Sequence, residues 1–524
     1  MEKKKEKKVK GLGNLYNGKM TLKHREWRGF RDTAYDFGRW LYLWGQLMKL
    51  SMKYPTQMMK ALFRYRWMST YLTTPAFVDR HTIGLRGTEL RICHKQFWVM
   101  LNHSIKMIST ILKGDQNLNK SKKSKEFSDK VILFDEMMPI QIMAGFPNLT
   151  GLAIQMIPVF LPSEMDQQEN MALIDAIENY GLPADVCPLP AAEAGAAISG
   201  EFPKIGKCFI SSSMPCDGSC MSSLYQDRAV NLPVYPLSPP VRFNEEQVQK
   251  YAVNDIKQCI KFIEEQTGES FDWDAYFTVM KRYNEETEYM LKKWDINKTP
   301  YPQVTGPSLA LHRMFAFQIA GSLTTDFIEN DKVVYEMMME QYEKDKEYYG
   351  AKGTTKYRHR ALVWSCPAHY YSNFSFWAQN CWGIQVLCDM ECMLSHHFFN
   401  TEDKEASLID LAKAYERMSM RSHTNGGHAN VLEELWKQCK EFNADIVLMY
   451  NHVSCKTMAG LSGLFEDQAR ERGIHLIWIE HDLCDPRTVS RKAMRDRVNR
   501  YMTTVFREEP LDPTLVDFED SKTW

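Results

Sequence analysis

The segment 445–459, DIVLMYNHVSCKTMA, limits the possible folds of this chain more than any other stretch. Its four consecutive apolar residues, 446–449, follow an acidic residue and end at a polar turn, which is typical of a strand buried on both faces of a parallel sheet. Cys455 then follows the carboxyl end of that strand. Residues 460–473 have the length and polarity of a helix that returns to the next apolar run, 476–479. Because ligands of open α/β sheets bind at the carboxyl ends of strands, we predict a chemical role for Cys455.

The composition indicates a multidomain globular chain. With 524 residues, of which 44% are hydrophobic, the chain is too long for one core, and we expect roughly two to four domains. Its formal net charge of -1 gives no general electrostatic reason to expect a nucleic-acid partner. The chain has 13 cysteines and no recognisable secretory signal. We therefore expect a cytoplasmic protein whose thiols are buried, catalytic or metal-binding rather than disulfide-bonded.

The first 130 residues differ from the rest. A charge run at 1–10 and a basic run at 120–125 bracket apolar residues at helical spacing, among them Trp40, Trp44 and Leu47, which predicts several amphipathic helices. Basic residues interrupt these helices well short of the ~20 apolar residues that a membrane span needs, so no transmembrane segment is expected. We expect the segment to pack on the body of the protein or on a partner subunit rather than on a membrane surface.

From residue 131 onward, apolar runs alternate with helical patterns, as in βαβ units. We predict strands at 131–134, 156–160, 207–211, 361–365, 384–387, 446–449 and 476–479, with helices at 171–180 and from 245 to about 349. The predicted fold class is α/β, with two Rossmann-like parallel-sheet lobes joined by a helical region and an added N-terminal helical segment. The predicted domains are 1–130 for the N-terminal helical extension, 131–242 for the first lobe, 243–356 for the helical region and 357–524 for the second lobe.

Two further cysteines have settings like that of Cys455. Cys216 follows the predicted strand 207–211 through the sequence SSSMP, and Cys187 lies in the loop GLPADVCPLP. Three thiolates from three loops fit a cubane iron–sulfur cluster that leaves one iron open to a ligand; the alternative is three unrelated buried cysteines. Cys220 is a competing ligand four residues after Cys216. Cys366, beyond another strand, is expected to pack in the core.

The motifs around these cysteines are similar to those of a known family. The stretch LMYNHVSCKTMAG, followed by DQARERGIHLIWIEHDLCDPR, resembles the carboxy-terminal signature of the 2-hydroxyacyl-CoA dehydratase and benzoyl-CoA reductase family. GLPADVC, SSSMPCDG and NHVSCK occur in the family's order, and the resemblance covers roughly 131–501. It implies that Cys187, Cys216 and Cys455 hold a [4Fe-4S] cluster between the two lobes. It also implies a heterodimer with a related second subunit that carries its own cluster.

The resemblance further implies radical chemistry on an acyl-CoA thioester. In this family an ATP-dependent iron–sulfur activator protein supplies a low-potential electron, and a ketyl radical anion forms on the substrate under anaerobic conditions. Dehydratases, which are lyases, then eliminate water from an (R)-2-hydroxyacyl-CoA, whereas the benzoyl-CoA reductases reduce an aromatic ring. We predict a dehydratase subunit. His452 and Asn451, beside the third cysteine, are candidate catalytic donors to the substrate carbonyl, although a histidine just after a strand is also often structural.

The sequence departs from the family in one place and leaves other functions open. Dehydratase subunits commonly carry a serine-rich, substrate-contacting segment near the first strand, where this chain reads LFDEMMP at 133–139. One alternative is a cluster-binding electron-transfer protein without a CoA substrate. Another is a zinc-stabilised structural subunit, although the three cysteine positions lack the close CxxC spacing that is usual for zinc.

Overall fold

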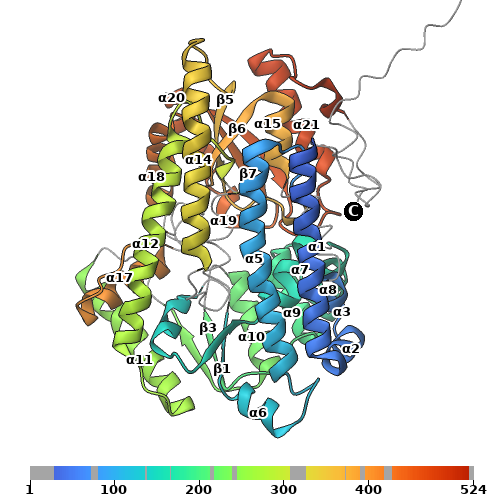
Figure 1. Cartoon of the computed structure of the whole chain (residues 1–524), viewed down its shortest axis with the longest axis vertical. Helices are drawn as coiled ribbons and strands as arrows, with labels where there is room; N and C mark the ends of the chain where they lie inside the picture. The colour runs from blue at the N-terminus through green and yellow to red at the C-terminus, as the bar shows by residue number, and fades with distance from the viewer. Residues whose placement is uncertain are drawn as a thin grey trace, which may run out of the picture.

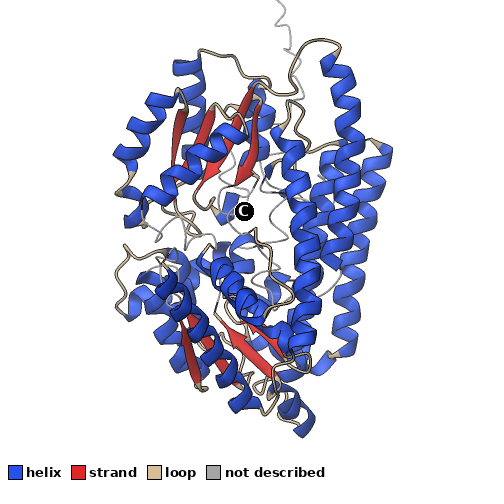
Figure 2. Cartoon of the chain, turned by 90° about the vertical axis from the view of Figure 1, so that its left-hand side faces the viewer, coloured by secondary structure: helices blue, strands red, loops and turns tan. Residues whose placement is uncertain are grey.

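The computed structural model describes residues 29–71, 81–135, 138–165, 167–212, 217–238, 245–306, 308, 326–371, 373–389, 396–417 and 428–517. Within these residues lie two four-stranded sheets, both entirely parallel. Figure 2 shows the sheets one above the other, with long helices running beside both. The predicted α/β class with two parallel-sheet lobes is therefore confirmed.

The first sheet has the strand order β2-β1-β3-β4. Its strands are β1 Val131–Phe134, β2 Thr150–Ala153, β3 Cys208–Ser212 and β4 Val234–Leu237. Alternate residues of β1 face two different cores, because successive side chains of a strand point to opposite faces. The helical elements of this part of the chain are α6 Lys122–Ser128, η4 Ile140–Gly145, η5 Met156–Phe160, α7 Leu161–Met165, α8 Gln167–Tyr180, α9 Pro188–Ile198 and α10 Asp217–Val230.

The second sheet has the order β6-β5-β7-β8. Its strands are β5 His359–Trp364, β6 Ile384–Asp389, β7 Ile446–His452 and β8 His475–His481. Helices cover both faces, which suits strands whose residues are almost all buried. The helical elements are η6 His369–Tyr371, α15 Phe374–Trp382, α17 Lys404–Glu416, α18 His428–Glu441, α19 Lys456–Ala459, α20 Ser462–Arg472, α21 Arg491–Tyr501, η8 Met502–Phe506 and η9 Pro513–Leu515.

Long helices run beside the two lobes, as Figure 1 shows. They are α1 Phe30–Lys53, α5 Gly87–Gly114, α11 Glu246–Thr267, α12 Trp273–Lys298 and α14 Asp326–Gly350, and the short α2 Pro55–Arg64 and α3 Arg66–Thr70 follow α1. The first half of α12 packs Tyr276 and Met280 into the core of the first sheet. Its second half packs Met290 and Trp294 into the core of the second sheet. A single helix thus fixes the two lobes relative to each other.

The N-terminal helices contribute to the core of the first lobe. Trp67 of α3 and Met100 of α5 are almost fully buried and belong to the same apolar cluster as Val131 and Leu133 of β1. Phe376 and Cys484, which follow strands of the second sheet, also reach this cluster. Of the two packing modes expected for this segment, the structure shows packing on the body of the protein.

One predicted strand is wrong. Residues 156–160 form the π-helical η5, and the edge strand β2 lies six residues earlier, at Thr150–Ala153. All of 156–160 is buried, so the apolar run reflects burial from every side rather than a strand. Short apolar runs do not distinguish a buried helical turn from a buried strand.

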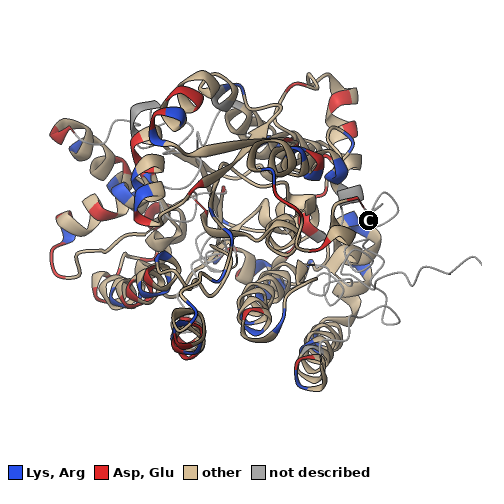
Figure 3. Cartoon of the chain, turned by 90° about the horizontal axis from the view of Figure 1, so that it is seen from above, with Lys and Arg blue, Asp and Glu red and all other residues tan. Residues whose placement is uncertain are grey.

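Basic and acidic residues are interspersed along the helices and loops, as the ribbon in Figure 3 shows. This distribution agrees with the near-zero net charge of the sequence. In the part of the chain that the structure describes, no helix is long and apolar enough to cross a membrane.

Candidate functional site

Cys455 lies three residues after the end of β7 and immediately before the short helix α19. The strand continues three residues beyond the apolar run, to His452, and the backbone N–H of Cys455 then donates to the carbonyl of His452 at 2.9 Å. The Cys455 side chain is half-buried against the core of the second sheet. The cysteine therefore lies at the carboxyl edge of the sheet, where the sequence placed it.

Cys187 occupies the N-cap position of α9. Pro188 follows at the first helical position, where its missing N–H costs nothing and its fixed φ starts the helix. The thiol makes no capping hydrogen bond to the helix. The positive end of the α9 dipole favours an anionic sulfur at this position.

The two cysteine loops meet where the lobes face each other. Sγ of Cys187, from the first lobe, lies 3.2 Å from Nε2 of His452, at the end of β7 in the second lobe. Beside this contact, the ammonium of Lys456 donates to Asp185 at 2.7 Å. Cys187 thus lies against the strand end that leads to Cys455, although 265 residues separate it from His452 in the sequence.

His452 is neutral at ordinary pH in this setting. Only 5% of the residue is exposed, and burial lowers the pKa of its imidazole to about 4. The backbone N–H of Ser454 lies 3.5 Å from Nδ1, and because an N–H can only donate, we assign the ring proton to Nε2. That tautomer donates to the sulfur of Cys187.

Two histidines that the sequence analysis did not select flank His452. The ring of His481, in β8, lies 5.4 Å from that of His452, and burial lowers its pKa well below the ordinary value. His369, just after β5, has a pKa lowered to about 3, first by burial and then by His452; its Nδ1 lies 2.8 Å from the hydroxyl of Ser163. Both histidines lie at or just beyond the end of a strand, as His452 does. That position in the sequence could have identified them as candidate site residues.

Asn451 lies on the opposite face of β7 from His452. Alternate β7 residues separate between the two cores: Val447 and Met449 face one of them, while Leu448 and Tyr450 face the other. By this alternation the Asn451 side chain points away from the side that contacts Cys187. Of the two predicted catalytic residues, only His452 has a contact with a cysteine of the other lobe.

The third predicted cysteine, Cys216, lies outside the described residues. Cys220, one turn into α10, is exposed. Cys366 is half-buried and packs against the core of the first lobe, in agreement with its expected packing role. Among the residues that the structure describes, no group of three or more His, Cys, Asp or Glu side chains is arranged to hold a metal ion.

The LFDEMMP segment places a buried carboxylate beside β1. Asp135 accepts hydrogen bonds from Gln155 and, at 3.0 Å, from Ser223 of α10. Gln155 also donates to Gln226 at 2.8 Å, and Gln226 donates to Glu193 of α9 at 3.2 Å. Buried carboxylates need such partners, so this network joins α9 and α10 to the end of the first strand.

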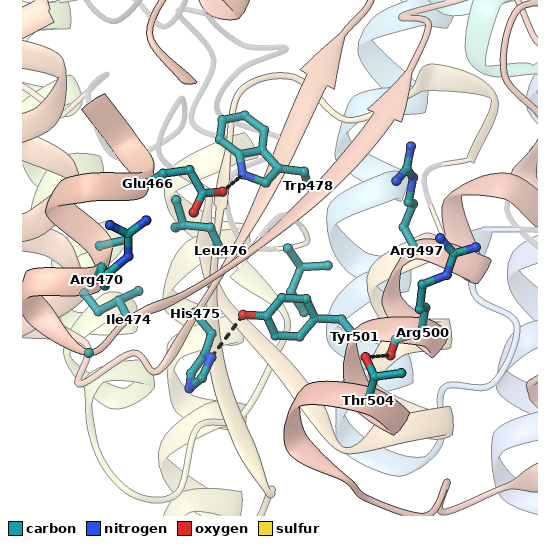
Figure 4. Close-up of a pocket in the computed structure, with 13 residues that line it drawn as sticks. Glu466, Arg470, Ile474, His475, Leu476, Trp478, Arg497, Arg500, Tyr501 and Thr504 are labelled. Atoms are coloured by element: carbon teal, nitrogen blue, oxygen red, sulfur yellow. Dashed lines mark hydrogen bonds between the residues drawn. The ribbon is translucent and has the colours of Figure 1, made fainter. Parts of the chain in front are cut away.

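A separate cavity of about 540 Å³ follows the outer edge of β8 between α20 and α21 (Figure 4). Nδ1 of His475 lies 3.1 Å from the hydroxyl of Tyr501, and Trp478 donates to Glu466. The cavity is lined in part by Arg470, which contributes to its basic character. None of the cysteines or catalytic candidates predicted from the sequence lines this cavity, so the candidate site remains the contact between the lobes.

Comparisons with known proteins agree with the motifs. A family model described as 2-hydroxyglutaryl-CoA dehydratase, D-component, matches residues 152–503. A search of the curated proteins gives no match. The matched stretch includes Cys187, Cys216, His452 and Cys455, whereas β1 and the helices before it precede the match. Because the model covers more than half of the 524 residues, this chain belongs to the family of the 2-hydroxyglutaryl-CoA dehydratase D-component.

Proposed function

We propose that this chain is the iron–sulfur subunit of a 2-hydroxyacyl-CoA dehydratase. In this proposal it eliminates water from an (R)-2-hydroxyacyl-CoA by a ketyl-radical mechanism after one-electron activation. Cys187, Cys216 and Cys455 hold a [4Fe-4S] cluster. The related second subunit, an ATP-dependent iron–sulfur activator and the acyl-CoA are the partners that this function requires.

The observation that carries the proposal is the contact between Cys187 and His452. The thiol of Cys187, in the first lobe, lies against the end of β7 in the second lobe, and β7 leads to Cys455. Cys187 also lies within a motif that the family resemblance covers. Thiols are the soft donors that iron–sulfur clusters require. The family match over residues 152–503 supports the same assignment independently of the geometry.

The two proposed ligands that the structure describes, Cys187 and Cys455, fit such a cluster in their chemistry. Cys187 and Cys455 are half-buried rather than sealed in a core, and α9 presents the positive end of its dipole to Cys187. When bound, a cluster with three thiolate ligands supplies a low-potential electron and an open coordination position. The chain's own residues surround this place with the buried, neutral rings of His369, His452 and His481, which exclude water.

His452 and Asn451 have different roles in the proposal. The Nε2–H of His452 donates to the sulfur of Cys187 and, with substrate bound, is available to the thioester carbonyl. Asn451, on the other face of β7, is the second candidate donor to the substrate. Replacing each residue in turn by alanine separates these roles. Loss of a residue that donates to the substrate carbonyl should lower turnover, while the iron content stays at the wild-type level.

Iron and sulfide analysis of anaerobically purified protein tests the ligand set. We expect four irons and four sulfides per chain, with broad visible absorption that Cys187→Ser, Cys216→Ser and Cys455→Ser each remove, because a hydroxyl is a poor ligand for a soft site. Cys220→Ser and Cys366→Ser are matched controls that should keep full iron content. Full iron and sulfide in the Cys455→Ser protein would contradict the proposal.

The substrate is tested with the reduced protein and its partner subunit. A 2-hydroxyacyl-CoA should change the paramagnetic resonance signal, whereas the corresponding free acid should not. With activator, ATP and a reductant, release of an enoyl-CoA supports the dehydratase. Reduction of an aromatic acyl-CoA in the same assay would instead identify a benzoyl-CoA-type reductase. An unchanged signal with every thioester would leave the chain as an electron-transfer protein.

A further inference from the structure

A cavity of about 440 Å³ lies between α1, α5 and α14, which run side by side in Figure 1. It is separate from the candidate site, where Cys187 contacts His452. Two of its three helices, α1 and α5, precede the stretch that the family model matches. Its lining residues are Arg31, Tyr35, Thr88, Arg91, Lys95, Met337, Glu340, Gln341 and Lys344.

Cations outnumber carboxylates on the cavity wall. Glu340 is the carboxylate that lines it, and this residue is already paired with Lys344 at 2.6 Å. The guanidinium of Arg91 is held in a fixed orientation, since it donates to Asp32 at 2.7 Å and to Thr88 at 3.1 Å. Asp32 balances the charge of this guanidinium, and the N–H groups that it leaves over are a preorganised set of donors for an anion.

Two further groups on the wall lack an acceptor. Lys95 is half-buried and has no ion pair within the described ranges, and its pKa is lowered by burial and by the neighbouring Arg39. The hydroxyl oxygen of Tyr35 is buried without a hydrogen-bond partner among the described residues. A buried hydroxyl without a partner costs free energy, and the half-buried ammonium of Lys95 attracts a nearby anion. An anion in the cavity satisfies both.

We propose that this cavity binds the phosphate group of a small phosphorylated molecule. A phosphate dianion offers several acceptor oxygens, which match the ammonium of Lys95, the hydroxyl of Tyr35 and the guanidinium of Arg91. The cavity is larger than one phosphate needs and lies in the range of small-molecule sites, so it also holds the rest of the molecule. The N-terminal helices therefore build a ligand site together with a helix of the family core.

Calorimetric titration of the full chain tests the site, with inorganic phosphate and glucose 6-phosphate as probes and glucose as the uncharged comparison. We expect both phosphates to bind and glucose not to bind. Lys95→Met should weaken phosphate binding about tenfold or more, because it removes a charge-assisted hydrogen bond. Tyr35→Phe removes only the hydroxyl and should weaken binding severalfold. Lys49→Met, an exposed lysine on α1, is the matched control and should bind as the wild type does.

Vesicles distinguish the sources of the phosphate. Vesicles that contain phosphatidic acid, compared with phosphatidylcholine alone, test whether a lipid headgroup supplies the group. If Lys95→Met weakens binding of the soluble phosphates but not of the vesicles, the ligand is a free phosphorylated metabolite. If it weakens both, a lipid headgroup is a further source of the phosphate. Equal phosphate affinity of the wild type and both the Lys95→Met and Tyr35→Phe proteins, or equal loss in the Lys49→Met protein, would overturn the proposal.

Discussion

At the scale of single residues, burial sets the protonation of several groups beside the candidate site. Glu164, next to the Ser163 that contacts His369, is almost fully buried, and burial raises the pKa of its carboxyl to about 8. The folded chain therefore binds this proton more tightly than the unfolded chain does. His369 and His452 show the opposite effect, because burial of an imidazole disfavours its charged form.

The raised pKa of Glu164 predicts a pH dependence of stability. The unfolded carboxyl has a pKa near 4.5, so its contribution to the free energy of unfolding falls as pH rises from about 4.5 to about 8, by about 1.4 kcal/mol for each pH unit. Glu164→Gln removes this dependence: the variant should gain stability relative to the wild type over that range. Chemical denaturation between pH 5 and pH 9 measures the free energy of unfolding of both proteins.

Glu509→Gln, at an exposed position, is the control. A difference in the free energy of unfolding between the wild type and Glu164→Gln that stays constant at all pH values would contradict the assignment.

At the scale of elements, a close helix contact positions α9 and therefore Cys187 at its start. A Cβ added at Gly195 would overlap the backbone carbonyl of Leu173 in α8. Backbone atoms cannot move aside as a flexible side chain does, so glycine is what lets α8 and α9 approach. The buried network of Asp135, Glu193 and Gln226 holds the same helix from its other side.

Gly195→Ala should therefore destabilise the protein by about 1–3 kcal/mol, the usual cost of overpacking. If Cys187 holds the proposed cluster, the same substitution should also lower the iron content of the anaerobic protein, since it displaces the helix that Cys187 precedes. Thermal unfolding and iron analysis measure the two effects. Gly463→Ala, in a helical position where a Cβ meets nothing within 4 Å, is the matched control and should be neutral or gain up to about 1 kcal/mol. Wild-type behaviour of Gly195→Ala would disprove the positioning role.

At the scale of the whole molecule, the lobes and the N-terminal helices share their cores. The first sheet is covered on one face by α5 and α9, and on the other by α11, α12 and α17. Helix α17 comes from the chain between β6 and β7 of the second sheet, yet its Tyr415 donates to the carbonyl of Leu237 at the end of β4, at 3.0 Å. Neither lobe is therefore complete in one continuous stretch.

This packing predicts the result of removing the N-terminal segment. A chain that begins at residue 131 loses Trp67, Met100 and their neighbours from the core of the first lobe. It should aggregate or bind a hydrophobic dye, and should lose cooperative thermal unfolding. Removal of residues 1–28 alone takes away none of these core residues and is the control. A soluble shortened chain with wild-type iron content would show that the segment is dispensable for the core.

The sequence by itself determined the class of fold, the edge of the sheet at which Cys455 lies and the family. The run 446–449 is part of β7, the run 131–134 is β1, and Cys455 lies three residues after the end of β7. These features are local, because a strand buried on both faces must be apolar along its own length. The order of the cysteine motifs can also be read directly along the chain, and it indicated the family that the match over residues 152–503 shows.

Only the tertiary structure decided which of these residues meet. It placed His452 against Cys187, turned Asn451 to the other face of β7 and gave the Asp135 carboxylate two donors, Gln155 and Ser223, in a buried network. It also made 156–160 helical and brought α17 to the first sheet. The physical reason is that an apolar pattern records how much of a segment is buried but not by what. The partners depend on packing between segments that lie hundreds of residues apart in the chain.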